Sequence, residues 1–228
     1  MKKKKILSII IPVYNEEKQI DRLMKHLTVF DEEAVNLIFV DGGSEDRTAD
    51  LLEQYGQTVI FSDKGRGKQL HTGALAAPDD YLLFLHADSY FEKSPLEEVD
   101  RVLTHHDMGA FKVEFDRSNL FLKLLAWGSN WRLKYRKIAF GDQGMFMTKN
   151  FYHRMEGFKP LPLMEDYDFS LRAKKAGYPV QGSQQKIITS SRFFDQHGVV
   201  KSLFIMQKCQ HMYRQGEPIE KIQELYRR

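Results

Sequence analysis

The segment YLLFLHAD, residues 81–88, is an apolar run that ends in a histidine and an aspartate. Three similar runs rich in β-branched residues precede it, and apolar residues at helical spacing lie between the runs. Continuously apolar strands that alternate with helices predict a mostly parallel sheet covered on both faces, which is an α/β fold. The three preceding runs are ILSIIIPV (6–13), NLIFVD (36–41) and TVIFSD (58–63).

The pattern changes after about residue 107, yet no segment there resembles a flexible linker. Residues 108–115 predict a further strand, 118–137 an aromatic and basic amphipathic helix or helix pair, and 199–215 and 217–227 terminal helices. A chain of 228 residues suits one domain at the usual ~100–200 residues per domain. We therefore expect a single domain over 1–228 with two halves, about 6–106 and about 107–228, each handling its own ligand.

Composition excludes several classes of protein. Cys209 is the one cysteine, so no intrachain disulfide can form, and we interpret its thiol as core packing. No apolar run approaches the ~18–20 residues that a transmembrane helix needs. The net charge of +3 is too mild to suggest a nucleic-acid partner. We expect a cytoplasmic protein without a transmembrane segment.

Polar residues follow the predicted strands. Asp41, Asp63 and Asp88 come at the ends of three runs, and the fourth run leads into PVYNEE, residues 12–17. Ligands of open parallel sheets bind beyond the carboxyl ends of the strands. A single acidic residue there could be an ordinary turn or helix cap. Polar residues at all four ends predict a ligand-binding edge.

The segment GRGKQLHTGA, residues 65–74, resembles a glycine-rich loop with two cations, Arg66 and Lys68. It lacks the glycine and hydroxyl spacing of a P-loop, and no Gly-x-Gly-x-x-Gly turn follows the first strand. Taken alone, it could be a flexible basic turn before a helix. Beside the acidic strand ends, it favours a nucleotide diphosphate as the ligand.

Five motifs in a fixed order carry a family resemblance. IIIPVYNEE (9–17), VDGGSEDRT (40–48), the 65–74 segment, HADS (86–89) and MEDYDFSLR (164–172) together resemble family 2 glycosyltransferases of the Rossmann-like GT-A fold. The later segments GDQGMFM, PLMEDYDFSLR and ITSSRFF resemble more narrowly a bacterial subgroup, the arsenosugar-biosynthesis or radical-SAM-associated glycosyltransferases. The resemblance implies that the first half binds a nucleotide and the second half an acceptor.

The resemblance assigns donor-binding residues. Asp41 is expected to accept hydrogen bonds from the base, which favours a uracil-like edge and therefore a UDP-sugar. Arg66 and Lys68 are expected near the base and diphosphate. The full set expected to bind the nucleotide-sugar is Pro12, Tyr14, Glu16, Asp41, Arg66, Lys68, His86, Ala87 and Asp88.

His86-Ala87-Asp88 stands where the family has Asp-x-Asp. The resemblance implies that Asp88 contacts a divalent cation, Mn²⁺ or Mg²⁺, that bridges the two phosphates. His86 departs from the family pattern. It either ligates the metal, which tilts the site toward Mn²⁺, or only hydrogen-bonds a ribose hydroxyl or a neighbouring side chain. His197 is a further candidate metal ligand.

The acidic pair Glu165-Asp166 matches the family's pair at a helix start, where carboxylates also suit the helix dipole. The resemblance implies that Asp166 is the general base of an inverting transfer to an acceptor hydroxyl. Glu165 is expected to orient Asp166 or touch the acceptor, and Asp168 to lie outside the site. The turn residues expected on the acceptor side are Asp142, Gln143 and Gly144.

The basic and aromatic stretch 118–137 leaves three interpretations open. It packs on the sheet and closes the acceptor pocket, it touches a membrane surface or lipid-linked acceptor, or it supports a homodimer. Because the chain lacks the C-terminal spans of many transferases that act on lipid-linked sugars, we expect a soluble acceptor.

Two rival functions remain beside a metal-assisted glycosyltransferase. A sugar-phosphate nucleotidyltransferase would want a glycine- and arginine-rich loop directly after the first strand, where PVYNEE stands. A catalytically silent nucleotide-sugar-binding protein is suggested by His86. Retention of Asp88 and Asp166 favours the enzyme.

Overall fold

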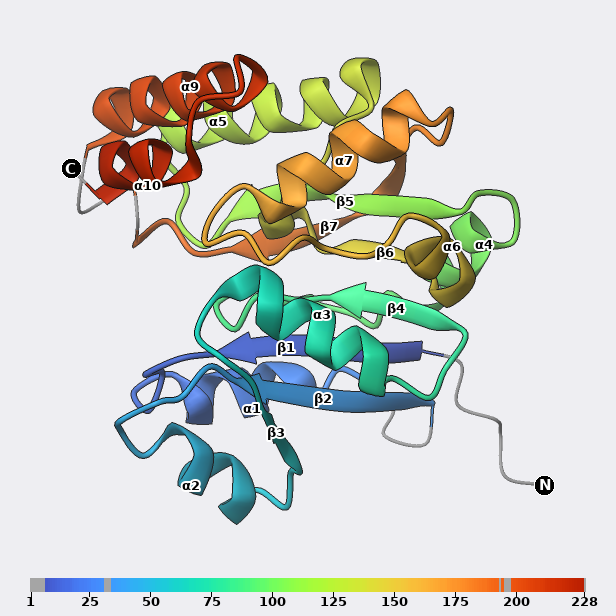
Figure 1. The fold of residues 1–228 in the computed structure, drawn as a ribbon. Helices are drawn as coiled ribbons and strands as arrows, with labels where there is room; N and C mark the ends of the chain where they lie inside the picture. The colour runs from blue at the N-terminus through green and yellow to red at the C-terminus, as the bar shows by residue number, and fades with distance from the viewer. Residues whose placement is uncertain (1–6, 31–33, 193, 195–197, 228) are drawn as a thin grey trace.

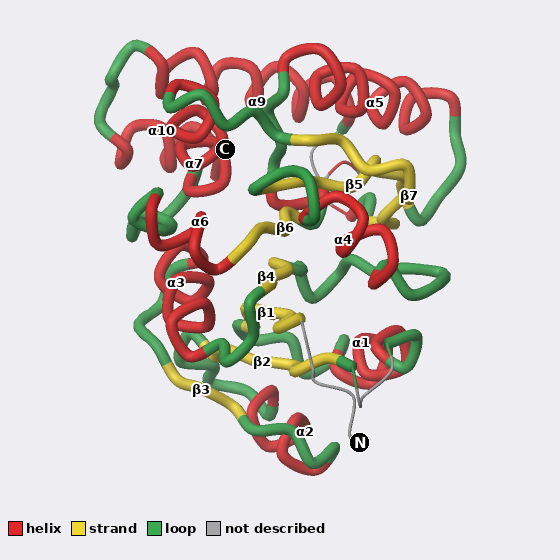
Figure 2. The backbone as a smooth tube through the Cα atoms, turned by 90° about the vertical axis from the view of Figure 1, so that its right-hand side faces the viewer, coloured by secondary structure: helices red, strands yellow, loops and turns green. Residues whose placement is uncertain are grey.

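The computed structural model describes residues 7–30, 34–192, 194 and 198–227. A seven-stranded sheet runs through the molecule in the order β3-β2-β1-β4-β6-β5-β7, with helices on both faces (Figures 1 and 2). The strands are β1 (Leu7–Val13), β2 (Val35–Asp41), β3 (Val59–Phe61), β4 (Tyr81–Phe84), β5 (Met108–Phe115), β6 (Met145–Thr148) and β7 (Gln181–Thr189). The helices are α1 (Ile20–Leu27), α2 (Thr48–Gln54), α3 (Arg66–Ala76), α4 (Leu96–Leu103), α5 (Leu120–Trp131), the π-helix η1 (Arg132–Arg136), the 3-10 helix η2 (Gly141–Gln143), α6 (Lys149–Arg154), α7 (Glu165–Lys175), α9 (Val199–Arg214) and α10 (Ile219–Arg227).

The predicted α/β class is confirmed, and the sheet is mostly parallel. β1 pairs in parallel with β2 and β4, β2 with β3, and β5 with β7. β6 was not predicted as a strand, and it runs antiparallel to both β4 and β5. A strand of four residues is too short to be recognised from a periodic pattern of apolar residues. β6 is the element that joins the first four strands to the last two in one sheet.

Two predicted boundaries near the ligand edge were wrong. β4 ends at Phe84, so His86 to Asp88 lie in the loop beyond it. The segment 65–74 is not a loop, because α3 begins at Arg66 directly after Gly65, whose φ is 138°. Gln69 fastens this helix by donating hydrogen bonds to the backbone carbonyls of Val13 (2.8 Å) and Val40 (2.9 Å). The glycines of the segment permit close helix packing; they do not break the helix.

The core lies on both faces of the sheet. Within β1, Ile9 and Ile11 join the cluster under α1 and α4, whereas Ile10 joins the cluster under α3 and α6. This alternation is what a strand buried on both faces requires. A third cluster lies between α7, α9 and α10 and includes the buried Cys209, as predicted for a packing thiol.

The helical C-terminal part is also confirmed. α5 and α9 lie at the end of the molecule nearest β5 and β7, and both views show them as neighbours (Figures 1 and 2). In the described part of the chain, every helix is too short or too polar to span a bilayer.

Candidate active site

A cavity of about 690 Å³ lies where the loop after β4, the start of α3, η2 and the start of α7 meet. One end is polar. The other end is walled by apolar side chains from α5, α9 and α10, among them Leu124, Met206 and Tyr226. The charged and imidazole side chains that line the cavity are Arg66, His86, Asp88, Arg132, Arg136, Asp142 and Asp166.

Arg66 and the acidic pair of α7 form the centre of the polar end. The guanidinium of Arg66 donates a hydrogen bond to Glu165 Oε1, and its Nη2 lies 3.9 Å from Asp166 Oδ2. Burial lowers the pKa of Arg66, but the two carboxylates overcome this and raise it above its ordinary value. Burial raises the pKa of Glu165, although Arg66 opposes the shift, and Glu165 Oε2 has no hydrogen-bond partner. Only Asp166 of the pair lines the cavity, so Glu165 acts by holding Arg66.

Asp166 is held by backbone groups. Its Oδ2 accepts a hydrogen bond from the N–H of Gly141 (2.6 Å), and its Oδ1 accepts one from the N–H of Tyr167 (2.6 Å). A β-carbon on Gly141 would lie only 2.6 Å from His86 Nε2 and 3.1 Å from Asp166 Oδ2. Glycine is therefore needed for η2 to approach both groups.

Two further groups in the cavity are buried without partners. His86 Nε2 and Asp142 Oδ1 make no hydrogen bond. Burial, followed by the charge of Arg66, lowers the pKa of His86 to about 4, so its imidazole is neutral at pH 7. Burial raises the pKa of Asp142 to about 6, against the opposing charge of Arg132. Buried polar atoms without partners are rare in folded proteins and indicate a place for a ligand or water.

Asp88 lies at the rim of the polar end. Its side chain is half-buried, and Arg192 Nη2 lies 3.6 Å from Asp88 Oδ2. Glu16 is close enough for its pKa to respond to both groups. Burial raises the pKa of Glu16, Arg192 lowers it, and Asp88 raises it again. The turn after β1 and the loop after β4 thus come together, as the strand-end pattern predicted.

The remaining candidates of the donor side lie along the same edge. Asp41 is fully buried; its Oδ1 accepts hydrogen bonds from the N–H groups of Gly43 (2.7 Å) and Ser44 (2.6 Å), and its Oδ2 has no partner. Tyr14 lies under Lys64, whose Nζ is 3.9 Å from the ring centroid. Pro12 is in β1, and Ala87 packs against the core below the loop.

Several candidates lie outside the cavity lining. Lys68 is paired with the exposed Asp63 (2.9 Å). Gln143 is fully buried and accepts hydrogen bonds from Arg132 Nη2 (3.1 Å) and the N–H of Phe140 (3.2 Å). Gly144 adopts a φ of 55° and faces the core. Of the three turn residues expected on the acceptor side, Asp142 alone lines the cavity. His197 lies outside the described residues.

Sequence reasoning did not single out Arg132 as a site residue. Its guanidinium lies over the Phe140 ring at 4.1 Å, lines the cavity and has an Nε without a partner. Burial lowers its pKa, while Asp142 and Asp166 raise it. Its position within an aromatic and basic stretch was visible in the sequence, but no motif there places its guanidinium in the cavity with Asp142.

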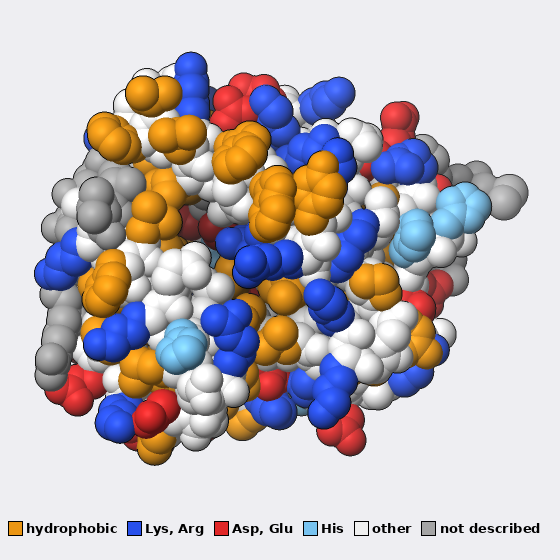
Figure 3. Space-filling view, turned by 90° about the horizontal axis from the view of Figure 1, so that it is seen from above, with side chains coloured by type: hydrophobic (Ala, Val, Ile, Leu, Met, Phe, Trp, Pro, Cys, Tyr) orange, Lys and Arg blue, Asp and Glu red, His pale blue; other side chains and the backbone are white. Residues whose placement is uncertain are grey.

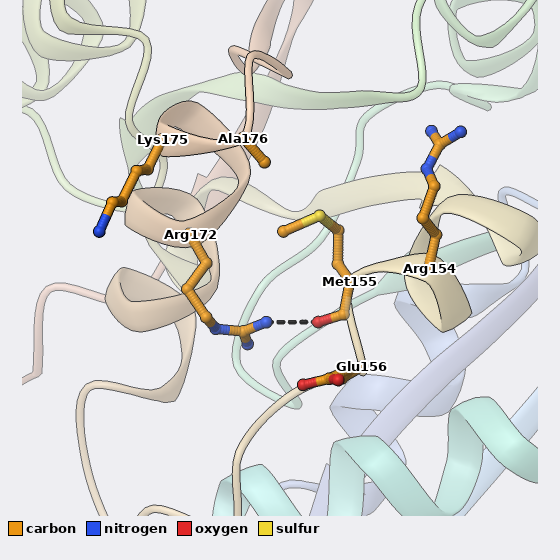
Figure 4. A pocket seen from close by; sticks show the side chains of 6 residues that line it. All are labelled: Arg154, Met155, Glu156, Arg172, Lys175 and Ala176. Atoms are coloured by element: carbon orange, nitrogen blue, oxygen red, sulfur yellow. Dashed lines mark hydrogen bonds between the residues drawn. The ribbon is translucent and has the colours of Figure 1, made fainter.

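A second cavity of about 300 Å³ lies between the end of α6 and the end of α7 (Figure 4). Arg172 crosses it and donates a hydrogen bond to the backbone carbonyl of Met155. None of the predicted site residues lines it, and we assign it no role.

The polar end of the cavity offers few ligands for a divalent cation. In the described ranges, no three or more His, Cys, Asp or Glu side chains lie close enough together to hold a metal alone. The cavity does offer the carboxylate of Asp88 and the unpartnered Nε2 of His86. Mg²⁺ and Mn²⁺ accept few protein ligands when phosphates and waters complete the shell, and Mn²⁺ also accepts imidazole. The residues fit a cation that a bound diphosphate helps to hold.

A mixed α/β sheet with a carboxylate-bearing cavity at its strand ends defines a broad class of nucleotide-using enzymes. Within that class, the sequence profile described as "Glycosyl transferase family 2" matches residues 8–161. The chain belongs to this family of transferase enzymes, as the resemblance predicted.

Curated relatives are similar over parts of the chain. Poly(ribitol-phosphate) beta-N-acetylglucosaminyltransferase TarS of Staphylococcus aureus is 27% identical over 108 residues, 43% of this chain and 19% of that protein. The probable glycosyltransferase YdaM of Bacillus subtilis is 22% identical over 209 residues, 79% of this chain and 49% of that protein. Undecaprenyl-phosphate 4-deoxy-4-formamido-L-arabinose transferase of Serratia proteamaculans is 31% identical over 126 residues, which are 50% of this chain and 38% of that protein. The chain therefore spans less than half the length of each.

Solved structures confirm the fold. Mannosyltransferase PcManGT from Pyrobaculum calidifontis, in complex with GDP-Man and Mn²⁺, superposes with a TM-score of 0.66 at 16% identity, covering 92% of this chain and 62% of that one. Residues 1–349 of TarS in complex with UDP-GlcNAc superpose with a TM-score of 0.59 at 20% identity, covering 82% of this chain and 56% of that one. The likeness at these identities concerns the fold alone.

Proposed function

We propose that the protein is an inverting glycosyltransferase that moves a sugar from a nucleotide diphosphate, with UDP as the carrier, to an acceptor hydroxyl. One observation carries the proposal. Arg66, Asp88 and Asp166 come from three distant segments of the chain and line one cavity beyond the strand ends. Family membership adds the reaction class. We also propose that the protein belongs to the arsenosugar-biosynthesis or radical-SAM-associated subgroup of this family. We further propose that it is located in the cytoplasm.

The donor occupies the side of the cavity built by about residues 6–106. Asp41 supports this placement, because its buried Oδ2 lacks a partner and can accept a hydrogen bond from a base N–H. Arg66, together with Arg132 and Arg136, supplies positive charge toward the diphosphate. The acceptor occupies the side built by about residues 107–228, next to Asp142.

A divalent cation, Mn²⁺ or Mg²⁺, would be held by Asp88, with His86 as a second contact. When bound, it neutralises the charge that develops on the departing diphosphate. The neutral imidazole of His86 suits this contact, because only an unprotonated nitrogen can ligate.

Asp166 is the general base. Its carboxylate takes the proton of the acceptor hydroxyl as that oxygen bonds to the anomeric carbon and the bond from this carbon to the diphosphate oxygen breaks. Attack from the face opposite the leaving group inverts the configuration. Arg66 Nη2 lies 3.9 Å from Asp166 Oδ2 and the Gly141 N–H donates a hydrogen bond to the same oxygen, so both groups hold the carboxylate in place.

A screen of nucleotide sugars for thermal stabilisation, with and without Mn²⁺, tests the proposal. Only a ligand that prefers the folded state raises the melting temperature. We expect UDP-sugars to raise it in a metal-dependent way. No stabilisation by any nucleotide or nucleotide sugar would contradict the proposal.

A catalytically silent nucleotide-sugar-binding protein is the second candidate, and His86 in place of the family's aspartate favours it. Product analysis with the stabilising donor separates the two functions. Tight binding without transfer or hydrolysis, with every acceptor offered, would support the silent protein.

A further inference from the structure

The helix α5 is apolar but largely uncovered. Leu122 is its only buried residue, while Leu120 is 71% and Trp127 67% exposed. Neighbouring segments add to this surface, which we call the α5–α9 face. Its exposed apolar side chains are Leu120, Phe121, Leu124, Trp127, Trp131, Tyr135, Leu203 and Phe204. A group of large exposed apolar side chains on neighbouring helices of a folded protein marks an interaction site.

The same face is basic. Neither α5, η1 nor α9 contains an aspartate or glutamate. Their lysines and arginines are Lys123, Arg132, Lys134, Arg136, Lys201, Lys208 and Arg214. No negative side chain within these three segments balances these positive charges. The space-filling view from above shows hydrophobic side chains beside lysine and arginine side chains on this face (Figure 3).

Cations and apolar groups are interleaved on this face. Lys208 Nζ lies 5.9 Å from the centroid of the exposed Phe204 ring, and the Arg136 guanidinium lies 5.7 Å from that of Trp131. Helices with Trp, Phe and Leu on one face and flanking Lys and Arg lie in the interface of anionic membranes. The charge and apolar patterns thus point to one kind of partner.

The face continues into the candidate active site. Phe121, Leu124 and Trp131 of α5 and Leu203 of α9 are partly exposed and also line the cavity. Leu120, Trp127 and Phe204 lie outside the lining. A partner surface that binds Leu120, Trp127 and Phe204 therefore lies at the mouth of the cavity.

A second copy of the chain is a poorer occupant. A symmetric dimer through this face would bring the lysines of two copies together, and like charges in contact oppose association. An anionic surface satisfies the apolar and the basic side chains at once.

We propose that the α5–α9 face docks onto an anionic lipid surface and thereby turns the mouth of the cavity toward the lipid. The apolar side chains enter the headgroup region, and Lys123, Lys134 and Lys208 contact the lipid phosphates. The inference goes beyond the proposed function and does not depend on which sugar or acceptor is used.

The two tryptophans of the chain, Trp127 and Trp131, both lie on this face, so intrinsic fluorescence reports on it directly. We expect vesicles of phosphatidylglycerol and phosphatidylcholine to shift the emission to the blue and to sediment the protein. Brominated lipids should quench the emission. Vesicles of phosphatidylcholine alone should do neither at low salt, and raised salt should weaken binding to the anionic vesicles.

A matched pair of double variants tests the location. Leu120→Ser with Phe204→Ser removes two outer side chains, 71% and 65% exposed, and keeps both tryptophans. Phe61→Ser with Leu75→Ser is the control on β3 and α3, at 63% and 55% exposure. The first variant should lose at least about tenfold in vesicle binding, and the control should bind as the wild type does. Circular dichroism checks the folding of both, and the quenching experiment on the wild type needs no variant.

Three results would overturn the inference. These are no binding of the wild type to anionic vesicles, equal losses in both double variants, and a wild-type dimer that only the α5–α9 variant dissociates. Calorimetry with UDP separates this inference from the proposed function, because donor binding does not require the face. Vesicle binding without donor binding would leave the docking intact and remove the glycosyltransferase.

Discussion

Two groups of polar side chains around α7 differ in how completely they are hydrogen-bonded. In the first group, Asp168 accepts hydrogen bonds from Lys159 (3.0 Å), Arg172 (2.6 Å) and Tyr213 (2.6 Å). Burial would raise the pKa of Asp168, but these partners hold it below its ordinary value. Each of its oxygens has a protein partner, and none of this network lines the larger cavity.

In the cavity beside the start of α7, partners are incomplete. Asp142 and His86 line the cavity, and their Oδ1 and Nε2 atoms are buried and make no hydrogen bond. The contrast separates two roles of the polar groups around α7. Saturated polar groups fasten α7 to its neighbours, whereas unsaturated groups keep capacity for a ligand, at a cost to stability.

The largest effect is expected from Asp166→Asn. The amide cannot accept the acceptor proton, so kcat should fall by about 100- to 10,000-fold. Donor affinity should change by less than about twofold, because Asp166 contacts the acceptor in the proposed mechanism. Steady-state kinetics and UDP titration measure the two quantities. Equal losses of donor affinity and transfer would remove Asp166 from the role of base.

Arg66→Met should be the next largest change, because it leaves Glu165 buried beside no cation. We expect the free energy of unfolding to fall by about 2–3 kcal/mol, at the low end for a broken buried pair because Arg66 is about a third exposed. Urea denaturation measures it. Adding Glu165→Gln removes the uncompensated charge and should restore part of the loss. If the double variant were less stable than Arg66→Met, the pairing would be misassigned.

Asp168→Asn should distinguish the hydrogen-bond network that stabilises α7 from the groups that line the cavity. The substitution weakens three hydrogen bonds, so we expect the free energy of unfolding to fall by about 1–3 kcal/mol. Transfer per folded molecule should stay at the wild-type rate. Urea denaturation and kcat, measured on the same preparation, test this. A loss of transfer without a loss of stability would place Asp168 in the site.

The strand-end rule predicted one polar edge, because parallel strands bring their carboxyl ends, and with them Asp41, His86 and Asp88, to the same edge of the sheet. The partners of these groups were not predictable. Arg66 and Glu165 are separated by 99 residues, and only the packing of α3 beside α7 brings them together. The antiparallel β6 was missed for a related reason, since its pairing partners lie far away in the chain. Gln143 was expected on the acceptor side, but the bond from Arg132 turns it inward.

The smallest effect concerns Glu98, which fastens α4 to β7 far from the cavity. Hydrogen bonds from Arg101, the Gln184 N–H and Ser183 hold its pKa at about 2. A depressed carboxyl pKa stabilises the fold above the unfolded value near 4.5, and this stabilisation is lost as pH falls from there toward 2. Glu98→Gln should therefore show a shallower loss of stability between pH 4.5 and 2 than the wild type, with unchanged activity at pH 7. Thermal melts across this range check it. Parallel pH profiles would show that Glu98 is not ionised as described.

Isothermal titration calorimetry of UDP, in the presence and absence of Mn²⁺, tests most directly the claim that the cavity with the unpartnered polar groups binds the donor. We predict metal-dependent binding that Asp88→Asn weakens by about tenfold or more and that Asp168→Asn leaves unchanged. Absence of UDP binding, or the same loss in both variants, would contradict it.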